Sequence, residues 1–145
     1  MSRQDAQDAR IERIIGDDDD LTFEDCIDRF YDHLKSNLQL PCIVTGIEDF
    51  RWEEFYVIGP GDPTEYERLR KDRPSYQDKY DLLAIEKDAS SEWMMFLDED
   101  IGGYVRRHSD DKEFFLGLAE IKPVDKKSKN YQLLRDYAVW FVNNR

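Results

Sequence analysis

The sequence predicts an α+β fold in which a small curled antiparallel sheet is flanked by a helix on its N-terminal side and by a C-terminal helix. Three observations predict it. Residues 22–38 and 128–145 repeat apolar side chains at helical spacing. Short segments rich in β-branched and aromatic residues lie between them, at 42–47, 80–87 and 104–118. Glycine, proline and aspartate separate these segments, as turns between strands require.

The 145 residues, 40% of them hydrophobic, suffice for one domain with a sizeable core. We expect residues 1–21 to form a polar, acidic N-terminal segment and residues 22–145 to form a single α+β domain. Near the start, Ile11, Ile14 and Ile15 have helical spacing, which predicts one docked turn or a short helix. The four aspartates at 17–20 predict an exposed linker, with a weak cation site as the alternative.

The clearest predicted helix begins after Thr22. Thr22 is a suitable N-cap, and Asp25 three residues later completes a capping-box pattern. The helix is expected to end by residues 38–40, because Pro41 disfavours helical backbone in the residue before it. One face of the helix is apolar and points to a buried position: it carries Phe23, Cys26, Ile27, Phe30, Tyr31, Leu34 and Leu38.

Two strands are predicted next, at residues 42–47 and 50–58, pairing with each other. The second does not alternate cleanly, so a bulge or burial on both faces is expected. The loop that follows contains two glycines and two prolines, and Asp62 with Pro63 is typical of a helix start. A short helix is therefore predicted over residues 64–71.

The core is expected to form in residues 93–124. After a third strand at 80–87, alternating apolar residues predict a strand over 93–97. Residues 104–107 and 113–118 predict a hairpin across the turn Ser109–Lys112, followed by a single helical turn before Pro123. Such short strands with a glycine bend at 102–103 are typical of an SH3-like barrel or a similar curled sheet.

The C-terminal segment predicts a docked helix with Ser128 as its N-cap. Its apolar stripe is broad, which favours packing onto the sheet over a dimer contact. The stripe consists of Tyr131, Leu134, Ala138, Phe141 and Val142, widened by Leu133, Tyr137 and Trp140.

The charge limits the classes of partner. The net charge is −12, which disfavours binding to nucleic acid or to an anionic membrane and favours cations or basic proteins. Residues 1–100 carry 27 of the 33 acidic side chains, whereas residues 101–145 have nine basic and six acidic ones. No apolar run approaches the roughly 18 residues of a membrane span, and residues 1–16 lack the apolar core of a signal peptide. A reducing cytoplasm is the expected location.

The sequence offers no recognised catalytic or zinc site. The two histidines, His33 and His108, and the two cysteines, Cys26 and Cys42, do not have ligand spacing. The cysteines are expected to be buried thiols rather than a disulfide or a metal pair. Phosphate-loop, dinucleotide-binding and nucleophile-elbow patterns are absent from the sequence, so we expect a protein that is not an enzyme.

Carboxylates are the chemistry that the sequence does supply, and they suit a hard cation such as calcium. The candidate ligands are the two densest local clusters, Asp98, Glu99 and Asp100, and Glu53 and Glu54. For the second cluster an exposed, charged sheet edge is the alternative. A calcium loop of the EF-hand type beginning at Asp98 fails, because Ser109 occupies its twelfth position, where a bidentate glutamate is needed.

Several stretches of the chain resemble the CcbP-like group, a small bacterial family of calcium-binding proteins. They are residues 33–46, 50–61, 92–107 and 112–145, with Leu38-Gln39-Leu40-Pro41 and Leu118-Ala119-Glu120-Ile121 at the places of the family's structural motifs. The resemblance covers residues 22–145 and implies calcium binding through surface carboxylates, with a buffering or signalling role. It assigns no individual ligand. The alternative is an acidic module that binds a basic protein partner or mimics nucleic acid.

Overall fold

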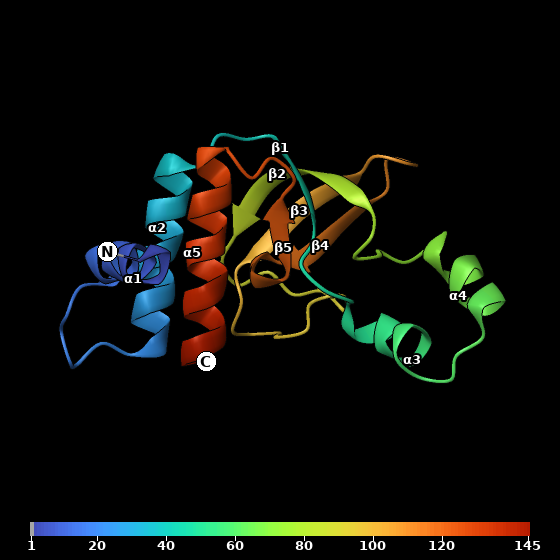
Figure 1. Cartoon of the computed structure of the whole chain (residues 1–145), viewed down its shortest axis with the longest axis horizontal. Coiled ribbons are helices and arrows are strands. Elements are labelled where there is room, and N and C mark those ends of the chain that lie inside the picture. Colours follow the sequence, from blue (N-terminus) through green and yellow to red (C-terminus); the bar gives the residue numbers. More distant parts are fainter. Residues whose placement is uncertain (1) are drawn as a thin grey trace.

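The computed structural model describes residues 2–145 and arranges them as helices packed around an antiparallel sheet (Figure 1). The helices are α1 (Arg3–Ile15), α2 (Phe23–Asn37), α3 (Glu54–Val57), α4 (Pro63–Arg70) and α5 (Lys129–Asn144), with single 3₁₀ turns η1 (Arg51–Glu53) and η2 (Leu118–Glu120). The strands are β1 (Cys42–Gly46), β2 (Lys79–Glu86), β3 (Gly102–Arg107), β4 (Glu113–Gly117) and β5 (Ile121–Pro123). The predicted α+β class is confirmed.

The sheet has the strand order β4-β3-β2-β1-β5, with every pair antiparallel. β4 and β5 form its two edges, so the sheet curls without closing into a barrel. The register of β2 against β3 shifts between Leu82 and Ala84, and an irregularity of this kind bends and twists a strand.

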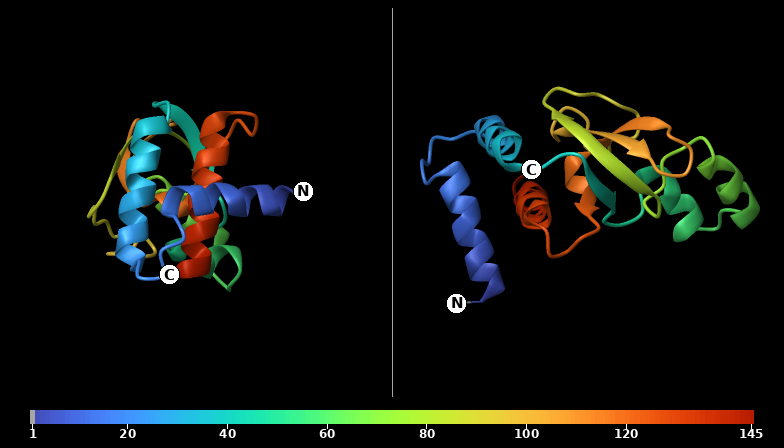
Figure 2. Two further views of the ribbon diagram at one scale, coloured as in Figure 1. Left: turned by 90° about the vertical axis from the view of Figure 1, so that its left-hand side faces the viewer. Right: turned by 90° about the horizontal axis from the view of Figure 1, so that it is seen from above.

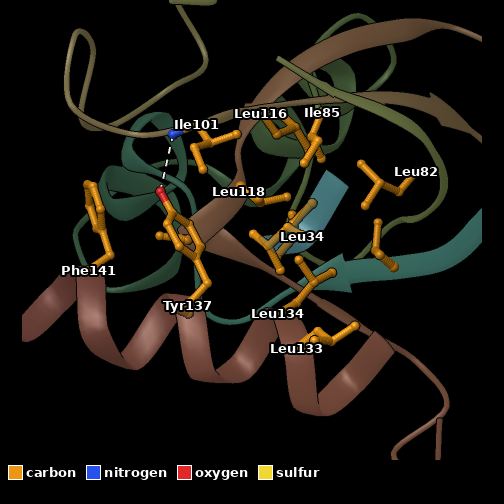
Figure 3. Packing of buried hydrophobic residues seen from close by; sticks show 14 of the residues in the cluster. Leu34, Leu82, Ile85, Ile101, Leu116, Leu118, Leu133, Leu134, Tyr137 and Phe141 are labelled. Atoms are coloured by element: carbon orange, nitrogen blue, oxygen red, sulfur yellow. Dashed lines mark hydrogen bonds between the residues drawn. The ribbon is translucent and has the colours of Figure 1, made fainter. Parts of the chain in front are cut away.

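Helices α2 and α5 cover the sheet and bury its core. The predicted caps are present, since the Thr22 and Ser128 hydroxyls accept from the backbone N–H groups of Asp25 and Tyr131. Both helices contribute fully buried side chains, namely Phe30 and Leu34 of α2 and Leu134, Tyr137 and Phe141 of α5. In Figure 3, Leu134 lies beside Leu34 of α2, and the Tyr137 hydroxyl points to Ile101, just before β3.

Helix α1 crosses the outer face of the pair formed by α2 and α5 (Figure 2). Ile11, Ile14 and Ile15 pack against the core, as the sequence predicts. The guanidinium of Arg10 binds both oxygens of the buried Asp136, at 2.8 and 3.0 Å. The short helix predicted for this segment is therefore present and longer than one turn, and the domain boundary at residue 21 stays a prediction.

The strand predicted over residues 50–58 is wrong, because this segment forms η1 and α3. The carboxylate of Glu53 accepts from the backbone N–H of Phe50 and closes a helical turn. Trp52 and Tyr56, four residues apart, then both pack against Tyr66 of α4. The aromatic spacing fits a helix, and β1 pairs with β2 and β5 instead.

The strand predicted over residues 93–97 is also wrong, because the chain forms a series of turns there. The carbonyl of Phe96 accepts from both Glu99 and Asp100, and a side chain, Glu120, accepts from the backbone N–H of Met95. These partners satisfy backbone groups that a strand would offer to a neighbouring strand. The hairpin β3–β4, the short helix after Asp62 and the single turn η2 are confirmed.

Cys26 and Cys42 are both free thiols and half-buried. Across residues 2–145, none of the helices combines the length and the apolar character needed to cross a membrane.

Candidate functional site

An acidic cleft of about 740 Å³ lies where three segments distant in the sequence meet. The first turns of α2, the turn after β2 and the loop before β3 form its walls. The cleft is lined by six residues with carboxylates, namely Glu24, Asp28, Asp88, Asp98, Glu99 and Asp100, and by one basic residue, Lys87. Lys87 is already engaged, because its ammonium lies 3.0 Å from Asp28. The cleft therefore carries an excess of negative charge.

Two of the exposed carboxylates that line this cleft lie at turns. Asp88 and Asp98 both have left-handed backbone conformations, with φ of 61° and 69°. Aspartate tolerates this conformation better than most residues, since its short polar side chain bonds locally. Asp98 and Glu99 are exposed and take part in no ion pair with a described residue. Their charges are consequently free to meet a cation.

Asp100 differs from its two neighbours because it is buried, with 5% of its surface exposed. Its carboxylate accepts from the Tyr137 hydroxyl at 2.6 Å and from the Ala119 backbone N–H at 3.1 Å. Burial raises the pKa of Asp100 to about 7; these hydrogen bonds oppose the rise, and the nearby charge of Glu120 adds to it. Tyr137 in turn accepts from Ile101, the hydrogen bond drawn in Figure 3.

Glu120 is a potentially functional residue that the sequence analysis did not single out. It lies in η2, and burial raises its pKa to about 7 as well. Its carboxylate and that of Asp100 both approach Gly117, where a Cβ would lie 2.5 Å from Asp100 Oδ2 and collide with Glu120 Oε2. A Cβ at this position would therefore require both carboxylates to shift. The sequence signal was a single acidic residue inside the otherwise apolar run 116–121.

The second predicted cluster, Glu53 and Glu54, lies outside the cleft lining. Glu53 is fully buried, and its oxygens accept from the Tyr66 hydroxyl, the Ser75 hydroxyl and the backbone of Tyr76 at 2.5, 2.7 and 2.9 Å, besides the backbone of Phe50. Four donors give this carboxylate a structural role. Burial and the hydrogen bond to Glu53 raise the pKa of Tyr66 to about 12. Glu54 is exposed on α3.

The residues of the cleft suit a hard cation in their chemistry, because they offer oxygen ligands without histidine or cysteine. Within residues 2–145, no group of three or more histidine, cysteine, aspartate or glutamate side chains is gathered closely enough to hold a metal ion. The carboxylates line one space but do not converge on one point.

Comparisons with known proteins bear on the fold. No family model and no curated protein matches the sequence. The crystal structure of Anabaena CcbP matches with a TM-score of 0.58 and 18% identity, over 97% of this chain and 92% of that one. The chain has the fold of CcbP. A calcium binding protein in the calcium-binding form matches equally well, with a TM-score of 0.58 and 18% identity, over 99% and 97% of the two chains.

The resemblance to the CcbP-like group predicted from the sequence is thus confirmed in the fold. The matches extend over almost the whole of both chains.

Proposed function

We propose that this protein binds calcium ions reversibly, without catalysis, at the acidic cleft, with Asp98, Glu99 and Asp100 as its principal ligands. The observation that carries the proposal is the meeting of three acidic segments, 24–28, 88 and 98–100, around one cleft. The similarity in fold to a calcium binding protein in the calcium-binding form supports it.

Calcium requires six to eight oxygen ligands but tolerates irregular geometry, so exposed carboxylates on flexible side chains suit it. The six carboxylate residues of the cleft, with water and backbone carbonyls, supply enough oxygen. Because these side chains are not gathered in advance, ordering them costs conformational entropy, and a modest affinity follows. Modest affinity suits a protein that buffers calcium or follows its concentration in signalling.

Asp100 couples the proposed binding to pH. A carboxylate must lose its proton to coordinate a metal ion. Since the pKa of Asp100 is raised to about 7, calcium and protons compete at this residue near neutral pH. We limit the proposal to the cleft, because the oxygens of Glu53 already have four donors and Glu54 is not among the cleft residues.

The test is calcium titration calorimetry on chelator-stripped protein at about 0.15 M salt with magnesium present, conditions that screen diffuse attraction. Saturable binding is expected for the wild type, and the double variant Asp98→Asn with Glu99→Gln should lose at least about tenfold in affinity, or 1.4 kcal/mol. Asp17→Asn with Asp19→Asn is the matched control, because it removes two exposed charges from the linker.

Equal binding by the cleft and linker variants would refute the cleft as the site. Heat that disappears in salt for every variant would mean that calcium only screens the acidic surface.

A further inference from the structure

A second concave surface includes Met95 and Phe96, which shortly precede Asp98–Asp100 in the same loop. This groove, of about 400 Å³, runs along α5 and is closed by Met95 and Phe96, by η2 and by the segment after β1. The volume falls in the range of sites that bind ligands. Its walls are mainly apolar and include Val142, which is 62% exposed although it belongs to the helix that forms the core.

One carboxylate lies in this apolar groove without a cation. Glu120 is half-buried, and its Oε2 accepts from the Met95 backbone N–H at 3.1 Å. No basic side chain among residues 2–145 lies within ion-pair distance of Glu120. A half-buried carboxylate has lost part of its hydration, and the hydrogen bond from Met95 replaces only part of that loss, so a positive charge brought into the groove would be favourable.

The rim of the groove adds to this preference. Glu48 and Asp49 line one side, and neither forms an ion pair with a described residue. Two guanidiniums, those of Arg135 and Arg145, also line the groove, but that of Arg145 stacks on the Phe96 ring at 3.6 Å. Three carboxylates therefore face two guanidiniums, and the groove keeps an excess of negative charge. The Arg145 contact also demonstrates that Phe96 presents a face suited to a cation.

The length of the groove distinguishes between kinds of ligand. Its lining extends from Arg135 of α5 to Arg145, the residue after the helix, which corresponds to about 15 Å along the helix axis. A small amine would fill one end, whereas a peptide of three helical turns matches the full length. Peptides bound in grooves of this type place apolar side chains along the floor.

We propose that the groove binds a segment of a partner protein that carries apolar side chains at helical spacing beside lysine or arginine. Its cation pairs with Glu120 and the rim formed by Glu48 and Asp49, and its apolar side chains cover Val139 and Val142. This role is separate from calcium binding at the cleft and does not depend on it.

The probe is a fluorescein-labelled synthetic helical peptide of leucine and lysine with leucines on one face. The fluorescence anisotropy of the peptide is measured as protein is added in the presence of a calcium chelator, so that the result is independent of calcium. A peptide with serine in place of every leucine has the same charge and serves as the ligand control. The wild type should bind the first peptide saturably and the second at least about tenfold more weakly.

Two variants test the groove residues. Glu120→Gln keeps the shape and the acceptor for Met95, and Val142→Asn changes an exposed side chain, so both should fold. Each is expected to weaken binding of the leucine peptide about fivefold or more. Glu54→Gln and Ile58→Asn are the matched controls on and beside α3, where Ile58 is 77% exposed, and these should bind like the wild type.

Three results would overturn the proposal. The first is equal binding of the two peptides, which would indicate attraction to the net charge alone. The second is unchanged binding by Glu120→Gln and Val142→Asn. The third is self-association of the wild type in sedimentation experiments that Val142→Asn abolishes, which would make a second copy of the chain the occupant.

Discussion

The acidic cleft and the apolar groove draw on the same loop, since residues 98–101 line the cleft and residues 95 and 96 line the groove. The carboxylates of the two spaces differ in exposure and in their neighbours. In the cleft, Asp98 and Glu99 are exposed among other acidic residues. In the groove, Glu120 is half-buried against apolar walls. An exposed cluster favours a small, hydrated ion, whereas a single carboxylate on an apolar surface favours a cation attached to an apolar body.

The buried Asp100 lines the cleft, and the half-buried Glu120 lines the groove. The two side chains meet beside Gly117, and Glu120 holds the backbone of Met95. A carboxylate with several hydrogen-bond donors around it therefore has a structural role, even when its neighbours in the sequence are also acidic. Glu53 is the clearest example, because its carboxylate accepts four hydrogen bonds.

The largest effect expected from a single change belongs to Glu53. Glu53→Ala leaves four buried or half-buried donors without an acceptor, so the free energy of unfolding should fall by roughly 3 kcal/mol. Urea denaturation measures it, with Glu54→Ala as the adjacent exposed control, expected to change stability by less than about 0.5 kcal/mol. Similar values for the two variants would contradict a structural role for Glu53.

A substitution at Gly117 sharpens the description of the carboxylate pair. Gly117→Ala introduces a Cβ that collides with oxygens of Asp100 and Glu120, and it should destabilise the protein by about 2 kcal/mol. Adding Glu120→Ala removes one of the two collisions, so the double variant should be more stable than the sum of the single effects predicts. Strict additivity would mean that the two side chains do not compete for this space.

The pair also predicts how stability depends on pH. Both pKa values are raised to about 7, above those of the unfolded chain, so the folded protein binds more protons between about pH 4 and pH 7. Unfolding free energy should therefore fall as the pH rises from about 5 to about 8. Protonation of the other carboxylates also stabilises the folded protein at low pH, because it relieves the repulsion among acidic side chains. The control is therefore Glu120→Gln, whose stability should depend less on pH than that of the wild type.

The smallest stability change is expected in the cleft. Asp98→Asn with Glu99→Gln removes two exposed charges that have no ion-pair partners among the described residues, so stability without calcium should change by less than about 0.5 kcal/mol. With calcium at about 100 times its Kd, the wild type should gain about 2.7 kcal/mol and the variant much less. Thermal denaturation with and without calcium measures both. Equal calcium stabilisation of the two proteins would contradict the assignment.

Local signals account for the parts of the fold that the sequence predicted. The caps Thr22, Asp62 and Ser128 act within three residues of their partners, and the β3–β4 hairpin needs only a short turn. The failures at 50–58 and 93–97 have a different origin. In these segments backbone N–H groups bond to turn carbonyls and to the side chains of Glu53 and Glu120, and a run of aromatic or apolar residues does not reveal such acceptors.

The candidate site was predictable to a similar degree. Asp98–Asp100 were found from their local density, but Glu24, Asp28 and Asp88 reach the same cleft only because α2 packs beside the sheet. Asp100 belongs to an acidic triplet in the sequence, yet the folded chain buries it against Tyr137. Burial of this kind depends on contacts 37 residues away along the chain.

The most direct test of the account is a calcium titration followed by the backbone amide NMR signals of the chelator-stripped protein, with magnesium present throughout. The account predicts saturable shifts concentrated in three segments, 22–28, 87–89 and 98–101, which share one dissociation constant. Shifts centred on Glu53 and Glu54, or small shifts spread over the acidic surface that never saturate, would contradict it.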